Sequence, residues 1–293
     1  MRFKKTAWLI CMAVLCLALY MVVISRNDTM REDVILGGDD GVYVGADRAS
    51  TTKPGDIQTV EDDGLDWPDI DITLTQYSLV NNDNPLSSAF TPDLAFKEDG
   101  VTIDPIYGTR YQQFSAAAKP YLDQMLKDMN DLGYTPYIAS SYRTYSYQAQ
   151  LYNTKTTGIF IEKGYSASQW NEEGAAAEAY AQAAEEAAKY RAKPGASEHQ
   201  LGLAVDIWDK ERSRVSDYYD MNEEFRNWLE ENSWKYGFIQ RYPTNKCLRT
   251  GWDEPWHYRY VGETVAKFMK DNNLCYEEFY AHYSSFTGKK SEG

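Results

Sequence analysis

Residues 197–206 read SEHQLGLAVD, a turn followed by an alternating segment. Alternation with a period of two predicts a β-strand with two different faces. The expected apolar face consists of Leu203, Val205 and Ile207. Asp206 then points to the opposite face, where the small Ala204 leaves room for a metal ion or a substrate. Gly202 allows a close approach of the backbone just after His199.

Other patterns predict helices and strands around this segment. Apolar residues at helical spacing indicate a helix that follows Ser115 and ends at Gly133. Further strands are expected over 134–141 and 256–260. Further helices are expected over 146–153, in a segment that ends before Gly237, in a segment that begins near Val265, and over 276–283. An alanine-rich surface helix or lid is expected over 172–191. Because helices and strands are mixed without regular alternation, the predicted fold class is α+β.

The chain has three histidines, and two of them lie in its most distinctive segments. His199 belongs to SEHQLGLAVD, and His257 belongs to residues 254–260, EPWHYRY. Histidine and aspartate are ligands that zinc accepts, so the two histidines and Asp206 form a candidate catalytic zinc site with one open position. Each of these residues alone is equally compatible with a structural role. His282, the third histidine, is expected to be structural.

Glu254 supplies the base that such a site needs. A carboxylate beside metal-activated water accepts its proton and contributes about 10²–10⁴-fold to the rate. Glu254 and His257 flank Pro255 and Trp256, so they converge only if the chain turns before the strand begins.

Three segments in this order resemble one family: SYRTYSYQ at 141–148, PGASEHQLGLAVD at 194–206, and TGWDEPWHYRY at 250–260. Together they resemble the VanY-type D-alanyl-D-alanine carboxypeptidases, peptidase family M15, subfamily B. The resemblance runs from about residue 79 to 273. It implies a zinc-dependent α+β peptidase that removes a C-terminal D-alanine from peptidoglycan stem peptides. L,D-carboxypeptidase action, endopeptidase action and a non-catalytic cell-wall-binding module remain alternatives.

The resemblance also implies a role for individual residues. His199, Asp206 and His257 match the zinc ligands, and Glu254 matches the catalytic acid/base. Arg143 matches the arginine that steadies the oxygen of the scissile carbonyl as negative charge develops. A fixed guanidinium suits this role because its donors are rigidly oriented.

Further residues match positions that contact the substrate. Gln148 and Ser197 match positions that help hold its terminal carboxylate, and Trp256 matches an aromatic side chain that shapes the pocket wall. Their alternatives are an ordinary helix residue for Gln148 and a core residue for Trp256.

The N-terminal segment predicts a membrane anchor. An uncharged run from Thr6 to Ser25 follows basic residues and is about the ~20 residues that cross a bilayer as a helix. A cleaved signal peptide is the alternative. The expected parts are residues 1–26 as a cytoplasmic tip and transmembrane signal-anchor, 27–71 as an acidic flexible stalk, 72–286 as the catalytic domain outside the cytoplasm, and 287–293 as a tail. Residues 27–71 contain thirteen Asp or Glu against three Lys or Arg, which is typical of a solvated, extended segment.

Charge and cysteine usage limit the partners and the covalent structure. A formal net charge of −14 argues against nucleic acid, whose phosphates require basic patches. No protein partner is evident. Cys247 and Cys275 lie outside the membrane segment, and they form either a disulfide or two separate buried thiols.

Overall fold

The computed structural model describes residues 64–95, 113–209 and 221–287. Within these residues a four-stranded antiparallel sheet has the order β3-β4-β6-β5. Its strands are β3 (Pro136–Ser140), β4 (Ala204–Asp209), β5 (Phe238–Tyr242) and β6 (Glu254–Tyr260). A separate ribbon pairs β1 (Leu94–Ala95) with β2 (Phe114–Ser115). The expected mixture of helix and sheet is confirmed.

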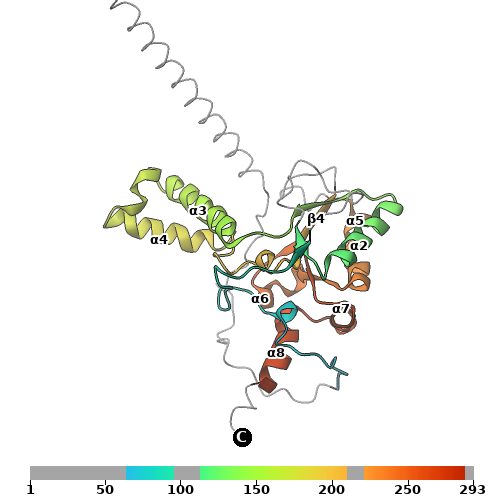
Figure 1. Cartoon of the computed structure of the whole chain (residues 1–293). Helices are drawn as coiled ribbons and strands as arrows, with labels where there is room; N and C mark the ends of the chain where they lie inside the picture. Colours follow the sequence, from blue (N-terminus) through green and yellow to red (C-terminus); the bar gives the residue numbers. More distant parts are fainter. Residues whose placement is uncertain (1–63, 96–112, 210–220, 288–293) are drawn as a thin grey trace, which may run out of the picture. The chain divides into compact units, whose positions relative to one another are not determined.

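Helices surround this sheet (Figure 1). The α-helices are α2 (Lys119–Asp131), α3 (Tyr145–Glu162), α4 (Ala175–Ala187), α5 (Glu223–Asn232), α6 (Cys247–Thr250), α7 (Glu263–Asp271) and α8 (Tyr276–Thr287). Short 3₁₀ turns are η2 (Thr75–Tyr77), η5 (Ala167–Asn171), η6 (Glu198–Leu201), η8 (Ser233–Tyr236) and η9 (Thr244–Lys246).

The main core lies between the sheet and two helices, α2 and α5, which lie together beside β4 (Figure 1). Val205 and Tyr258 are partners in the register of β4 and β6, and both belong to this core. Because side chains alternate along a strand, their neighbours Asp206 and His257 point to the other face of the sheet. The expected separation of apolar residues from Asp206 therefore holds. All six residues of β4 are nevertheless buried or nearly so, because a central strand is covered on both faces.

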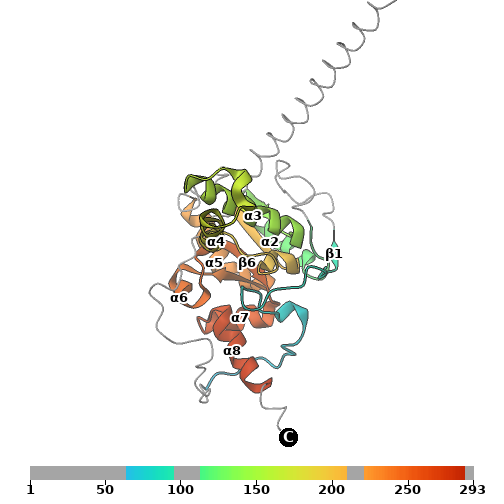
Figure 2. The same ribbon diagram turned by 90° about the vertical axis from the view of Figure 1, so that its left-hand side faces the viewer.

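A second cluster of apolar residues surrounds α7 and α8, which lie next to each other in both views (Figures 1 and 2). Its members include Tyr276 and Phe279, which are fully buried. Trp67 stacks on His282 with ring centroids 3.6 Å apart, so His282 has the structural role expected of it. The sequence places residues 64–71 in the stalk, but Trp67 and Ile70 pack against this cluster. The burial of two large apolar side chains is favourable because it removes their surface from water.

The helices α3 and α4 lie side by side (Figure 1) and share a third apolar cluster. The sequence predicts a helix only over 146–153, whereas α3 continues to Glu162. Its second half contains threonines and Gly158, which are weak helix formers, so tertiary packing extends the helix. The buried alanines of α4 provide that packing: Ala176, Ala179, Ala183 and Ala187.

Two expectations concern the ends of the chain and its cysteines. Among the described residues, no helix is long and apolar enough to cross a bilayer. The predicted anchor at 1–26, the stalk up to residue 63 and the last six residues lie outside the described ranges. Cys247 and Cys275 form no disulfide, so the thiols are separate as in the second alternative, but only Cys275 is buried and Cys247 is partly exposed. Burial raises the pKa of Cys275 to about 12.

Candidate active site

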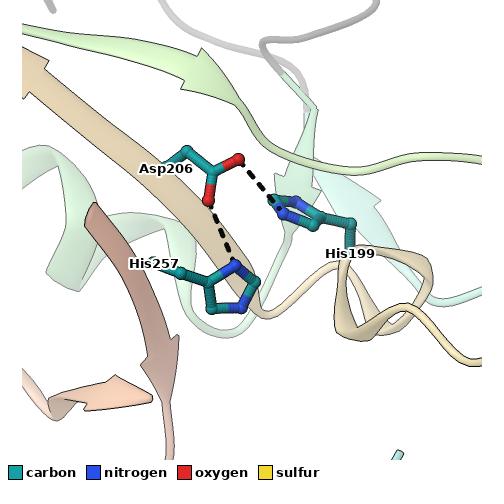
Figure 3. A group of neighbouring side chains, drawn as sticks. All are labelled: His199, Asp206 and His257. Carbon is teal, nitrogen blue, oxygen red and sulfur yellow. Dashed lines mark ion pairs between the residues drawn. The ribbon is translucent and has the colours of Figure 1, made fainter. Parts of the chain in front are cut away.

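Asp206 and His257 meet across the sheet because they are register partners on the neighbouring strands β4 and β6. The Oδ1 atom of Asp206 lies 3.1 Å from Nδ1 of His257. Both side chains are almost fully buried, with 1% and 3% of their surface exposed. Figure 3 shows the two side chains extending from their strands toward one another.

His199 reaches the same point from the turn η6, which immediately precedes β4. Gly202 ends this turn with φ of +70°, a conformation that glycine adopts readily. The Nδ1 atom of His199 lies 2.6 Å from the carbonyl oxygen of Ser141. The other ring nitrogen, Nε2, therefore faces Oδ2 of Asp206 at 3.3 Å (Figure 3).

These three side chains fit a metal ion. One ligand atom from each lies within 4.8 Å of the others. His199 Nε2, Asp206 Oδ1 and His257 Nδ1 are buried, and none of them makes a hydrogen bond. Buried polar atoms without partners are costly, so their convergence indicates a cation that would bind all three. Two histidines, one aspartate and an open position are a donor set that zinc accepts in catalytic sites.

The charge of the site also favours a cation. Burial, together with the nearby charge of Arg143, lowers the pKa of His199, so its imidazole is neutral as a ligand must be. Burial alone raises the pKa of Asp206, but His199 and His257 hold it well below its usual range. Burial lowers the pKa of His257, yet the carboxylates of Asp206 and Glu198 raise it to about 10. The carboxylates around His257 therefore favour positive charge at this ring, and a bound metal ion would supply that charge in place of the proton.

Glu254 is the first residue of β6, and its Oε2 atom lies 3.8 Å from Nδ1 of His257. The expectation of a turn before the strand is wrong, because the strand already includes Glu254. An irregularity in the register with β5 replaces the turn: Gln240 pairs with Tyr258, and Tyr242 pairs with Glu254. Four residues of β6 thus span two residues of β5, which brings Glu254 and His257 to one side.

Arg143 follows β3 and adjoins the same centre. Its Nη2 atom lies 3.3 Å from Asp206 Oδ2, and its Nε donates to Ser140 Oγ over 2.8 Å. The backbone N–H of Arg143 donates to the carbonyl oxygen of His199 over 3.2 Å. These contacts fix a buried guanidinium, of which 4% is exposed, beside the metal ligands.

The three residues expected at the substrate differ in their placement. Gln148 accepts a hydrogen bond from Arg143 Nη1 at 3.2 Å, and it donates to the carbonyl oxygen of Ala192 at 2.8 Å. Ser197 is buried at the start of η6, two residues before His199. Trp256 lies in the main core, with its ring nearly perpendicular to that of Trp208. Their roles at the substrate stay predictions.

Glu198 is a residue of this site that sequence reasoning missed. It is fully buried, and its Oε2 atom lies 3.5 Å from Nε2 of His257. Its Oε1 atom accepts from Arg241 Nε at 2.8 Å and lies 2.9 Å from Arg259 Nη1. Burial alone raises the pKa of Glu198, but the two guanidinium groups hold it well below its usual range.

A signal for this network is present in the sequence. Arg259 stands between two tyrosines and Arg241 precedes Tyr242, both in segments that form strands, and a charged side chain buried there requires a counter-ion. Ala204 is the register partner of Arg259. We expected the space beside the small Ala204 side chain to hold a metal or a substrate, but Arg259 is the residue paired with Ala204 on the neighbouring strand.

Comparison with known proteins assigns the family. A family model described as VanY, D-alanyl-D-alanine carboxypeptidase, matches residues 111–263. A D-alanyl-D-alanine carboxypeptidase of Enterococcus faecalis is 36% identical over 202 residues. The match covers 69% of this chain and 64% of that relative, slightly less than two thirds of its length.

Three solved structures are similar to this one. VanYB in complex with D-alanine-D-alanine has 34% identity and a TM-score of 0.52, over 69% of this chain and 95% of its own. A vancomycin-resistance D,D-pentapeptidase VanY in complex with Zn(II) has 33% identity and a TM-score of 0.53, over 70% and 99%. The LD-carboxypeptidase LdcB has 29% identity and a TM-score of 0.54, over 70% and 85%. The chain belongs to the VanY family of D-alanyl-D-alanine carboxypeptidases.

Proposed function

We propose that this protein is a zinc-dependent carboxypeptidase that removes the C-terminal D-alanine from peptidoglycan stem peptides. The observation that supports this most directly is the convergence of three buried ligand atoms, one each from His199, Asp206 and His257, that make no hydrogen bond. Glu254 and Arg143 border the same point. The zinc-bound relative and the relative bound to D-alanine-D-alanine agree with this chemistry.

Each residue of the site has a separate role in the proposed reaction. A bound zinc ion lowers the pKa of a water molecule to about 7 and polarises a carbonyl group. Glu254 accepts the proton of the attacking water and passes it to the nitrogen of the departing D-alanine. Arg143 stabilises the negative charge that develops on the oxygen of the scissile carbonyl. Asp206 and Gln148 hold this guanidinium in place beforehand.

The test uses the purified full-length chain in detergent, loaded with zinc, and stem pentapeptides as substrate. We expect release of D-alanine, detected by mass spectrometry, and we expect Glu254→Ala to abolish it while zinc stays bound. Glu173→Ala, at an exposed glutamate, is the matched control and should keep full activity. Metal-dependent release at full rate in Glu254→Ala would exclude Glu254 as the base.

A second candidate function is L,D-carboxypeptidase activity on tetrapeptide stems, which the similarity to LdcB supports. Parallel assays with pentapeptide and tetrapeptide substrates separate the two activities by which substrate loses its last residue. If zinc binds but neither peptide is shortened, the result favours a non-catalytic wall-binding module.

We also propose that residues 1–26 anchor the protein in the cell membrane, with the catalytic domain outside the cytoplasm. The uncharged run from Thr6 to Ser25 behind basic residues supports this placement. Membrane fractionation combined with protease treatment of intact spheroplasts tests it. Recovery of the full-length chain in the medium, or its protection from protease, would contradict it, whereas a shortened soluble chain would indicate a cleaved signal peptide.

A further inference from the structure

We propose that Glu198 is a positioning residue that fixes the ring of His257, and that Arg241 and Arg259 keep its carboxylate in place for this purpose. This inference rests on the proposed zinc site and goes beyond it, since Glu198 would bind neither the metal nor the substrate. It concerns the side of His257 that faces away from Asp206.

Glu198 and Asp206 contact opposite nitrogens of one imidazole. Asp206 Oδ1 lies 3.1 Å from Nδ1 of His257, and Glu198 Oε2 lies 3.5 Å from Nε2. A carboxylate next to Nε2 favours a proton on that nitrogen and leaves the lone pair on Nδ1. Nδ1 is the nitrogen that faces the other two ligands, so the contact selects the tautomer that binds a metal.

The two oxygen atoms of Glu198 have different partners. Oε1 contacts both arginines, at 2.8 Å from Arg241 Nε and 2.9 Å from Arg259 Nη1. Oε2 makes no hydrogen bond to any described residue and is the atom next to His257. A carboxylate that served only to neutralise the arginines would use both oxygens for them, as paired guanidinium and carboxylate groups commonly do. Because only one oxygen contacts the arginines, we infer that the other oxygen of Glu198 has a second role, the contact with His257.

Glu277 on α8 balances the charges behind Glu198. It binds Arg241 through both of its oxygens, at 2.9 Å from Nη1 and 2.6 Å from Nη2. Arg259 donates from Nη2 to the carbonyl oxygen of Gln76 at 2.8 Å. Buried charges are tolerated when they are paired and hydrogen-bonded. Glu277 and Glu198 thus neutralise two arginines, and the chain of contacts runs from α8 through β5 to the metal ligand.

The test measures zinc affinity directly, by competition with a chromophoric chelator, on the full-length chain in detergent. We expect Glu198→Gln to weaken zinc binding by about 10–100-fold, as is typical when the partner of a metal-binding histidine is altered. Only three histidines are present, so the imidazole nitrogen signals in the NMR spectrum can be assigned. We expect the Nε2–H signal of His257 to move in the variant while that of His282 stays unchanged.

Glu277→Gln is the matched control, because it removes a carboxylate from the same network but leaves Glu198 beside His257. Its zinc affinity should change by less than about threefold, since its effect must pass through Arg241. If Glu198→Gln does not fold, the double variant Glu198→Gln/Arg241→Gln removes an acid together with a base. It is then compared with Arg241→Gln alone.

A folded Glu198→Gln variant with zinc affinity within about twofold of wild type and unchanged His257 signals would overturn the inference. It would leave Glu198 with a purely structural role. Failure of the proposed activity looks different: wild-type protein would release no D-alanine from either peptide, while the effect of Glu198→Gln on zinc affinity would persist.

Discussion

Arg143 is held by its neighbours before any substrate arrives. Its three nitrogens contact Ser140, Gln148 and Asp206. A donor fixed in this way does not have to reorient when charge develops on the substrate, so no free energy is lost to reorganisation. We therefore expect Arg143→Lys to lower kcat by about 10²–10³-fold, because a lysine keeps the charge but loses the fork of donors. Steady-state D-alanine release measures the effect.

Two controls accompany this substitution. Arg249→Lys, at an arginine whose side chain is 72% exposed, should leave kcat unchanged. The zinc content of Arg143→Lys should match wild type, since the arginine is no metal ligand. A kcat within about fivefold of wild type would show that the positive charge alone suffices, and it would contradict the importance given to the fixed fork of donors.

The three side chains that converge in the candidate metal site could be selected from the sequence because chemistry limits the choice. Few residue types bind zinc, and the chain has only three histidines. Glu198 escaped prediction although it stands next to His199. Its function depends on Arg241 and Arg259, which lie far along the chain, and only the register of β4, β5 and β6 brings them together.

The strand β6 shows why Glu254 could not be placed from periodicity. A regular strand directs residues three apart to opposite faces, so Glu254 and His257 would diverge. The irregular register against β5 between Gln240 and Tyr242 reverses this. Such a bulge arises from the pairing of two strands and leaves no mark in the pattern of either one.

The helix α4 was predicted from its alanine content as a surface helix or lid, and only four of its 13 residues are buried. Alanine signals helix propensity and gives little indication of burial. Ala183 and Ala187 are fully buried against α3, because small side chains let the two helices approach closely. The expectation of a surface helix therefore holds for most of α4, but it did not identify the face that packs against α3.

The turn that carries His199 into β4 depends on Gly202. A Cβ atom there would lie 2.9 Å from Leu94 Cδ2 and 3.1 Å from Pro92 Cγ, at φ of +70°. We expect Gly202→Ala to lower the free energy of unfolding by about 2–4 kcal/mol, from backbone strain together with the steric conflict. We also expect it to weaken zinc binding, because His199 and Asp206 lie on either side of the turn. Denaturant unfolding and chelator competition measure the two effects.

Gly164→Ala is the matched control for this glycine. Gly164 has φ of +92°, but a Cβ atom there meets nothing within 4 Å. Only the backbone strain of about 1–2 kcal/mol should appear, with zinc affinity unchanged. Equal losses of stability in the two variants would show that Leu94 and Pro92 adjust freely.

The domain is larger than the part by which its family is recognised. The family model matches residues 111–263, whereas Glu277 and Gln76, which pair with the buried arginines, lie outside it. Gln76, near the start of the described residues, and Glu277 on α8, near their end, thus both contact the network of buried charges. The predicted catalytic domain, residues 72–286, includes both residues, but their pairing with the arginines could not be predicted, because contacts between distant segments have no local pattern.

A chain that ends after Leu274 tests the importance of α8. It loses the buried rings of Tyr276 and Phe279, each worth about 3–5 kcal/mol, and leaves Arg241 without Glu277. We expect a large fall in thermal stability and loss of stoichiometric zinc. A chain that ends after Thr287, and lacks only residues 288–293, is the control and should behave as wild type. Equal zinc content in both would show that the site forms without α8.

The two histidines of the proposed zinc site differ in how easily a mutation can remove the hydrogen-bonding or charged partner of the ring. The partner of His199 is the main-chain carbonyl of Ser141, which every amino acid at position 141 would supply. The partner of His257 is the side chain of Glu198, which a single codon change can remove. Random mutagenesis that spares the ligands themselves should therefore yield metal-deficient variants mainly around His257. Spontaneous mutations that abolish activity without changing a ligand should likewise be found mainly around His257.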